Sequence, residues 1–197
     1  LKAMCHTYDD LRIDKHHMMV ISPDEGALNR NIYYSSAMGV DMGMFYKRRD
    51  YTRVVNGRNP IVAHEYLGDS VEGKDVFVAD DIIASGDSIL DLAYNLKKRK
   101  AKRVFAGATF AFFTSGLEAF DKAYADGVID QVFATNLTYT PQEVLDRPWF
   151  SQADMSKYMA FVIATLNHDQ SLSYLLNPWN RIEKLLTKYR AEHPYED

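Results

Sequence analysis

The chain has 197 residues, enough for one α/β domain with a substantial core, and its 47% hydrophobic and 25% charged composition is ordinary for a globular protein. A net charge of −4 argues against nucleic acid as the main partner, because a phosphate backbone needs a basic surface. No apolar run approaches the roughly 20 residues of a membrane span, and the single cysteine, Cys5, favours a reducing cytoplasm.

Apolar runs and helical patterns alternate along the chain. Strands are predicted at residues 18–22, 42–46, 75–79, 103–110 and 131–135, with helices at 27–37, 89–98 and 117–125 and a polar loop at 50–64. Strands separated by helices imply right-handed βαβ crossovers. We therefore expect an α/β fold whose mostly parallel five-stranded sheet is flanked by helices. Residues 1–197 would form a single domain, with residues 151–197 as a helical C-terminal extension.

Polar and charged clusters follow three of the predicted strands. They lie at residues 22–26, 47–49 and 80–88. Ligands of such sheets bind beyond the carboxyl ends of the strands, so we expect the three clusters to share one site.

The segment at residues 80–88 carries the most information. Asp80 and Asp81 follow an apolar run, and Ser85-Gly86-Asp87-Ser88 then leads into a helix. The N–H groups and hydroxyls of such a turn can hold a phosphate, helped by the helix dipole. The acids repel phosphate but can bind sugar hydroxyls or a hard divalent cation. Adjacent acids are common after α/β strands, and it is the turn at this spacing that predicts a phosphorylated sugar as ligand.

This segment resembles the ribose-phosphate loop of type I phosphoribosyltransferases. Further motifs precede it in order: Ser22-Pro-Asp24-Glu-Gly26, then Lys47-Arg-Arg49, then a Gly-Asp-containing segment at residues 68–75. The set is similar to the second half of the ribose-phosphate pyrophosphokinase family, over about residues 18–140.

That resemblance implies an enzyme that transfers the diphosphoryl group of ATP to C1 of ribose 5-phosphate, making phosphoribosyl diphosphate (PRPP) for nucleotide biosynthesis. It implies Lys47 and Arg49 as catalytic cations and Mg²⁺ as cofactor. The other implied site residues fall into three groups: Asp80, Asp81, Ala84, Ser85, Gly86, Asp87 and Ser88 for ribose 5-phosphate; Asp24, Glu25 and Gly26 for diphosphate; and Asp24, Asp80 and Asp81 for the metal. Glu25 either meets diphosphate through a cation or faces solvent.

Departures from the family pattern keep two alternatives open. Ala84 replaces a usual acid, Ala27 a usual glycine, and Asp87-Ser88 a common Gly-Thr. One alternative is a phosphoribosyltransferase that joins PRPP to a base, and the other is a non-catalytic regulatory domain that binds PRPP. The basic cluster at residues 47–49 favours the pyrophosphokinase, because transferases of this fold generally lack it.

The chain begins at Leu1 without an initiator methionine, which we interpret as a fragment. The resemblance implies a missing N-terminal half that supplies the adenine site and a further metal-binding histidine, and we also expect a homo-oligomer. Residues 50–63 are predicted to be mobile without ligand and to order over ATP. The helical spacing at residues 182–189 predicts a helix that packs on the body or meets a missing domain or subunit.

Overall fold

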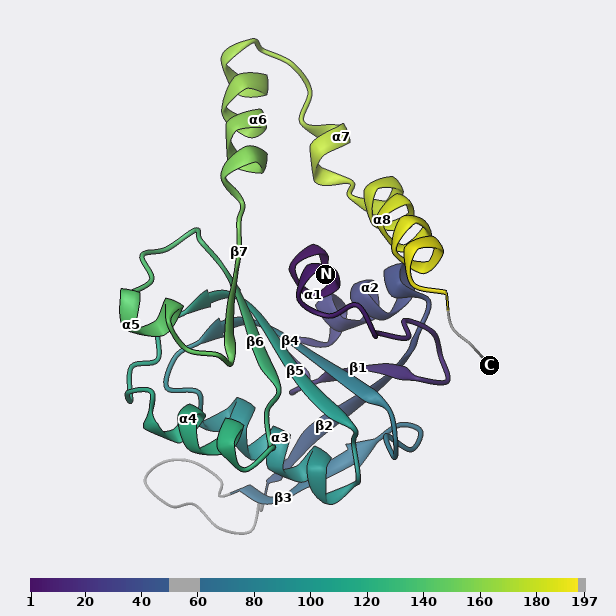
Figure 1. Ribbon diagram of the computed structural model, residues 1–197, viewed down its shortest axis with the longest axis vertical. Helices are drawn as coiled ribbons and strands as arrows, with labels where there is room; N and C mark the ends of the chain where they lie inside the picture. The colour runs from purple at the N-terminus through teal and green to yellow at the C-terminus, as the bar shows by residue number, and fades with distance from the viewer. Residues whose placement is uncertain (50–60, 195–197) are drawn as a thin grey trace.

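The computed structural model describes residues 1–49 and 61–194, with side chains left out at residues 47–49 and 61–64. One seven-stranded sheet forms the centre of the described chain (Figure 1). The strands are β1 (Met18–Ser22), β2 (Asp41–Arg49), β3 (Ile61–Leu67), β4 (Asp75–Ile83), β5 (Arg103–Ala111), β6 (Gln131–Thr135) and β7 (Phe150–Ala153). The helices are α1 (Lys2–Thr7), α2 (Leu28–Met38), α3 (Asp87–Lys98), α4 (Glu118–Ala125), α5 (Gln142–Leu145), α6 (Ser156–Asn167), α7 (Ser173–Leu176) and α8 (Trp179–Glu192).

The sheet order is β3-β2-β1-β4-β5-β6-β7, and every neighbouring pair is parallel except β2 and β3. The chain moves outward from β1 through β2 to β3, then returns to β4 on the other side of β1. The strand order therefore reverses between β1 and β4. In open parallel sheets this reversal leaves a crevice at the carboxyl ends of the two strands, where ligands bind.

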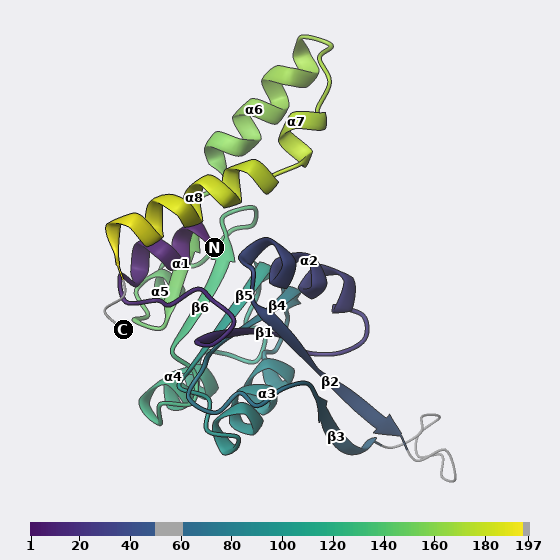
Figure 2. The same cartoon turned by 90° about the vertical axis from the view of Figure 1, so that its right-hand side faces the viewer.

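Helices cover both faces of the sheet (Figure 2). One core cluster joins the strands to α3 and α4, and a second joins them to α1, α2 and α8. Burial on both faces explains why the central strands are continuous apolar runs rather than alternating patterns. All five residues of β1 are buried, as are the first five of β4.

The α/β class and the mostly parallel sheet are confirmed, but the predicted number of strands is wrong. Residues 61–64 belong to β3 rather than to the predicted loop. This strand lies at the sheet edge, where polar residues are tolerated and the apolar signal is weak. The other missed strand, β7, has only four residues, too few for a periodic pattern.

Two predicted strands are longer in the structure than the sequence indicated. β2 runs through residues 47–49, so its basic cluster lies within the strand. β4 likewise continues to Ile83 and contains Asp80 and Asp81. Pairing with β5 keeps this segment extended, as in the partners Asp80 and Ala108, although the side chains of residues 80–82 are no longer buried.

The C-terminal helices behave differently from one another. α6 projects away from the sheet, and α8 returns to lie beside α2 (Figures 1 and 2). Leu186 and Tyr189 of α8 are buried, and the Tyr189 hydroxyl accepts from Leu11 N at 3.0 Å and donates to Tyr8 O at 2.8 Å. The predicted helix at residues 182–189 thus packs on the body of the protein. No helix in the described part of the chain is long and apolar enough to cross a bilayer.

Candidate functional site

The first part of the candidate site is the turn after β1. Asp24 accepts a hydrogen bond from Ala27 N through Oδ1 at 3.1 Å, and so occupies an amide at the start of α2. Ser22 is fully buried and its hydroxyl donates to Asp24 O at 2.8 Å, which fixes the turn. Glu25 and Gly26 are exposed. The Glu25 side chain therefore faces solvent, and an anion at this turn would meet the Asp24 carboxylate as well as backbone amides.

The second part is the acid pair, Asp80 and Asp81, near the end of β4. Asp81 N donates to Asp80 Oδ1 at 2.8 Å, so the first carboxylate turns back over the backbone of the second residue. Desolvation raises the pKa of Asp80 although the Asp81 N–H favours its ionised form, and a side-chain hydrogen bond between the two carboxyl groups raises it further. The same contact holds the pKa of the more exposed Asp81 below its usual value. Charge on Asp24 also raises the pKa of Asp80, which places the turn within electrostatic range of the acid pair.

Arg30 of α2, the helix that follows the Asp24 turn, contacts the acid pair. Its Nη1 lies 3.4 Å from Asp80 Oδ1, and its Nη2 lies 3.3 Å from Asp81 Oδ2. The sequence analysis missed this residue, because a single arginine in a helix gives no signal of its own. Only the packing of α2 beside β4 brings it to acids 50 residues away.

The third part is the turn at residues 84–88, which leads into α3. The Ser85 hydroxyl donates to Asp87 Oδ2 at 2.9 Å, and Asp87 N donates to Ser85 Oγ at 3.4 Å. Ala84 is exposed, and its carbonyl accepts from Thr114 N at 2.9 Å. Ser88 is exposed in the first turn of the helix. The turn presents hydroxyls and amides, and Asp87 adds a carboxylate.

Gly86 is required by the geometry of this turn. Its φ of 92° lies in the left-handed region that favours glycine. A Cβ at this position would lie 2.2 Å from Cε2 of Phe120, a fully buried ring of α4. The close contact fixes the turn against the body of the domain.

The two predicted catalytic cations cannot be placed in the same detail. The backbones of Lys47 and Arg49 lie in β2, paired with residues 64 and 61 of β3. β2 is next to β1, so the strand belongs to the same region of the sheet as the Asp24 turn. The side chains of both cations, and residues 50–60 of the predicted mobile loop, lie outside the described residues.

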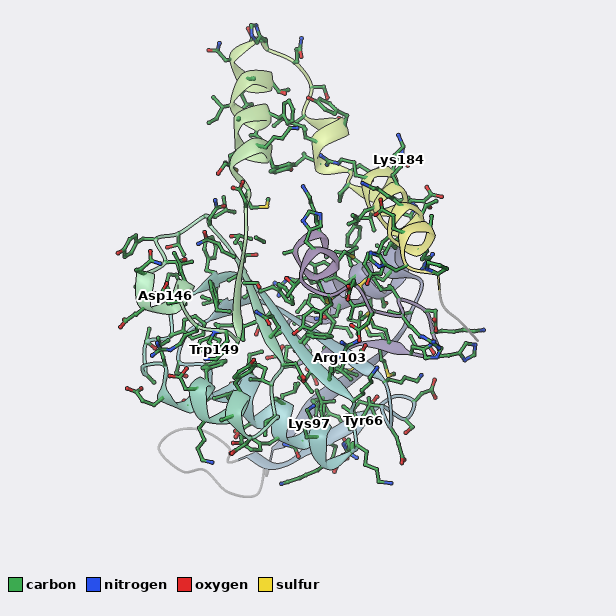
Figure 3. All side chains as sticks on the ribbon, viewed as in Figure 1. Tyr66, Lys97, Arg103, Asp146, Trp149 and Lys184 are labelled. Atoms are coloured by element: carbon green, nitrogen blue, oxygen red, sulfur yellow. The ribbon has the colours of Figure 1, made fainter. Side chains whose placement is uncertain are left out.

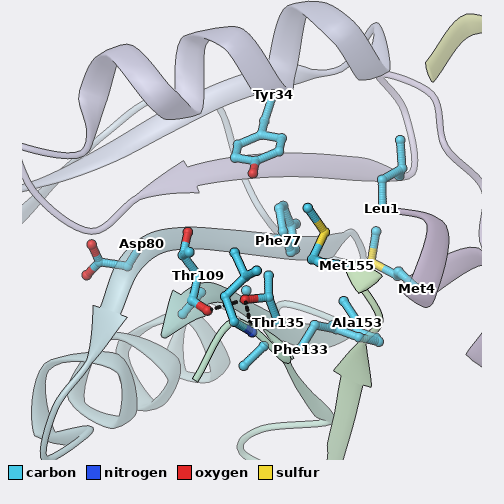
Figure 4. A pocket seen from close by; sticks show the side chains of 14 residues that line it. Leu1, Met4, Tyr34, Phe77, Asp80, Thr109, Phe133, Thr135, Ala153 and Met155 are labelled. Carbon is cyan, nitrogen blue, oxygen red and sulfur yellow. Dashed lines mark hydrogen bonds between the residues drawn. The ribbon is translucent and has the colours of Figure 1, made fainter. Parts of the chain in front are cut away.

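A cavity of about 310 Å³ adjoins the acid pair (Figure 4). Asp80 lies at one end, and Leu1 and Met4, at the start of the chain, lie at the other. The remaining wall is largely apolar, with aromatic rings from α2, β4 and β6 and hydroxyls from Thr109 and Thr135. A ligand bound at the acid pair therefore has room for a neighbouring group of substantial size.

The acids fit a hard divalent cation in chemistry but do not form a complete cage. Among residues 1–49 and 61–194, no three His, Cys, Asp or Glu side chains are grouped to hold a metal ion. Mg²⁺ prefers oxygen ligands and commonly takes one or two carboxylates together with substrate phosphates and water. Asp80 and Asp81 provide such a partial set, with Asp24 nearby.

Comparison with known proteins identifies the fold and the family. Residues 2–139 match the phosphoribosyl transferase domain family, which is most of the chain. The chain belongs to this family. The resemblance noted in the sequence is confirmed by ribose-phosphate pyrophosphokinases, which are 35% identical over 160 residues in Vibrio cholerae serotype O1 and 30% in Chromobacterium violaceum.

The chain matches about half the length of these family relatives. The match covers 81% of the chain in both cases, but only 48% of the Vibrio cholerae protein and 46% of the Chromobacterium violaceum protein. The crystal structure of phosphoribosylpyrophosphate synthetase from Mycobacterium smegmatis has the same fold, with a TM-score of 0.66 at 21% identity. That alignment covers 84% of the chain and 48% of the synthetase.

Proposed function

We propose that the chain is part of a ribose-phosphate diphosphokinase, which transfers the β,γ-diphosphoryl group of ATP to C1 of ribose 5-phosphate. One observation carries the proposal: the Asp24 turn follows β1 and the acid pair lies near the carboxyl end of β4, the two strands between which the order reverses, and the turn at residues 84–88 continues from β4. The similarity to ribose-phosphate pyrophosphokinases supports it.

The sugar phosphate would span the acid pair and the turn that follows it. Asp80 and Asp81 would accept hydrogen bonds from the ribose 2- and 3-hydroxyls, because ionised carboxylates are strong acceptors. The 5-phosphate would bind the hydroxyls and amides of residues 84–88, at the positive end of α3. Gly86 permits the left-handed turn from which α3 begins.

Mg²⁺ would be held by Asp80 and Asp81 together with substrate phosphate oxygens, because the predicted third ligand, Asp24, is not grouped with them closely enough to complete a three-carboxylate site. When bound, it would neutralise charge on the diphosphate. The same cation would remove the repulsion between Asp24 and a diphosphate at the β1 turn.

The transfer itself would need positioning and charge stabilisation more than a covalent catalyst. A bond forms between the C1 oxygen and the β-phosphorus as the bond from that phosphorus to the α,β-bridging oxygen breaks. AMP leaves with the bridging oxygen, and the hydroxyl proton is released. Lys47 would contribute a point charge and Arg49 a planar fork of donors to the phosphate oxygens.

The proposal assigns only part of the reaction to these residues. The chain matches about half the length of the curated relatives, and the adenine site that the resemblance implies lies in their other half. We expect the isolated chain to bind ribose 5-phosphate but to make negligible PRPP.

The test uses the full-length protein with ATP, ribose 5-phosphate and Mg²⁺, followed by ³¹P NMR. The proposal expects PRPP and AMP to appear in equal amounts. Consumption of added PRPP with a purine or pyrimidine base, without its synthesis, would identify a phosphoribosyltransferase instead. Binding of PRPP without turnover in either direction would identify a regulatory domain.

A further inference from the structure

Arg30 is the cation that the described structure places on the acid pair. Its two terminal nitrogens contact different carboxylates, one on Asp80 and one on Asp81. The contacts of 3.4 and 3.3 Å are longer than the roughly 2.7–2.9 Å of strong charged hydrogen bonds. The guanidinium is also about a third exposed, at 32%. These contacts neutralise charge but can separate at small cost.

The backbone that carries Arg30 is held much more firmly than its side chain. The neighbouring Asn31 is fully buried, and its Nδ2 donates to Ala79 O and to Ala27 O, each at 2.9 Å. The first of these bonds ties α2 to β4 immediately before the acid pair. The start of the helix is therefore fixed against β4, while the guanidinium is held by the longer contacts with the acid pair.

An anion bound at the N-terminus of α2 would be a second partner for the Arg30 guanidinium, within the same helix turn. Arg30 is three residues after Ala27, whose amide is capped by Asp24. The positive end of a helix favours anions, but the Asp24 carboxylate already occupies this one. An anion bound here would need an additional cationic side chain, and Arg30 is suitably placed to supply it.

We propose that Arg30 is a shared counter-ion, which pairs with Asp80 and Asp81 in the free protein and binds the substrate diphosphate when a divalent cation occupies the acids. This inference rests on the proposed function and adds a binding residue to it. It predicts opposite effects on two affinities: removal of Arg30 strengthens the binding of a divalent cation and weakens the binding of an anion. A residue that only supported the local fold would weaken both.

The experiment compares wild type with Arg30→Gln and with Lys98→Gln, which removes the same charge from an exposed position at the end of α3. Mn²⁺ binding is measured by electron paramagnetic resonance at low salt, and pyrophosphate binding by calorimetry at saturating Mg²⁺. Relative to Lys98→Gln, we expect Arg30→Gln to bind Mn²⁺ about 3- to 10-fold more tightly. We expect it to bind pyrophosphate about 3- to 10-fold more weakly.

Unchanged or weaker Mn²⁺ binding in Arg30→Gln would overturn the role of Arg30 as counter-ion to the acids. Unchanged pyrophosphate binding would overturn its proposed contact with the diphosphate. Arg30→Lys provides the same test if Arg30→Gln does not fold, because a single ammonium cannot bridge both carboxylates. Its Mn²⁺ affinity should then exceed that of wild type, and equality would count against the proposal.

Ribose 5-phosphate binding to wild type is measured separately. Its absence would reject the proposed function, and the opposite shifts in Arg30→Gln would still stand as evidence for the counter-ion.

Discussion

The two ends of β4 carry acids in contact with arginine, but the contacts differ in kind. At the amino end, Asp75 is buried and binds Arg103 through two bonds, from Nε at 2.8 Å and from Nη2 at 2.6 Å. Arg103 Nη1 also donates to Asp10 Oδ1 at 2.8 Å. Figure 3 marks Arg103 among the side chains of the domain. At the carboxyl end, Arg30 meets the acid pair only through the longer contacts to Asp80 and Asp81 described above.

The Arg103–Asp75 ion pair supports the fold, whereas the contacts of Arg30 leave the acid pair available to a ligand. Burial and bidentate geometry make the Arg103 network costly to break, because either partner alone would be an uncompensated buried charge. The acid pair is more accessible, with Asp81 63% exposed, so water can replace the arginine. Stability is therefore expected to depend on the amino end of β4, and ligand binding on its carboxyl end.

Removing Arg103 tests the amino end with the largest expected effect. We expect Arg103→Gln to lower the free energy of unfolding by about 3–5 kcal/mol, because Asp75 loses its partner while buried. Urea denaturation measures the change, and Lys102→Gln, at an exposed neighbour, is the control. A loss below about 1 kcal/mol would show that water or rearrangement compensates Asp75.

Lys47→Ala tests whether the carboxyl ends of the strands carry the chemistry. In the full-length enzyme we expect the catalytic rate to fall by about 10³-fold, as for loss of a transition-state charge clamp, with little change in ribose 5-phosphate affinity. Steady-state kinetics and calorimetry on the same variant give both values, and Arg49→Ala should behave alike. If ribose 5-phosphate affinity collapses while the catalytic rate survives, these cations bind the substrate in its ground state. The phosphoribosyltransferase and regulatory-domain alternatives would then gain support.

Asp81→Asn should separate binding from stability at the carboxyl end. We expect ribose 5-phosphate binding to weaken by about 1–3 kcal/mol through loss of charged hydrogen bonds. Unfolding should change little, because Asp81 is exposed and its contact with Arg30 is long. Calorimetry and thermal unfolding on one preparation measure both. Asp91→Asn, at an exposed site on α3, is the control, and equal affinity in the two variants would remove Asp81 from the sugar site.

Substitution of Asp10 is expected to have the smallest effect on stability. The pH dependence of that effect tests the ion pairs of Arg103 at the amino end of β4. The hydrogen bond from Arg103 is the largest cause that holds the pKa of Asp10 below its usual value. This carboxylate therefore stabilises the fold above its unfolded pKa of about 3.9, and the contribution is lost as pH falls through the folded pKa. We expect Asp10→Asn to be slightly less stable at pH 7, with the difference from wild type shrinking in acid. A constant difference across pH would exclude the ion pair as its cause.

The central strands could be predicted because their signal is local. The apolar runs at residues 18–22 and 131–135 have the same bounds as β1 and β6. Burial on both faces requires an apolar side chain at nearly every position of such a strand. β4 could not be bounded in this way, since its last four residues stay extended through pairing with β5 rather than through an apolar pattern.

The candidate site shows the same limit. The sequence predicted that the Asp24 turn, the acid pair and the turn around Gly86 belong to one site, and the structure places the first two at the carboxyl ends of the neighbouring parallel strands β1 and β4. Arg30 and Asn31 gave no signal, because their partners are far away in sequence. A side chain whose role depends on a distant partner is identified only when the helix that carries it is packed.

The sequence by itself determined the α/β class, the order of the motifs and the residue types available to bind a sugar phosphate, because apolar periodicity and turn chemistry act over a few neighbouring residues. Tertiary structure decided which cation faces which acid. The reversal of strand order between β1 and β4 brings α2 beside the acid pair. At the amino end of β4, Arg103 of the neighbouring strand β5 contacts Asp75. Charge interactions depend on distance and burial, and packing sets both.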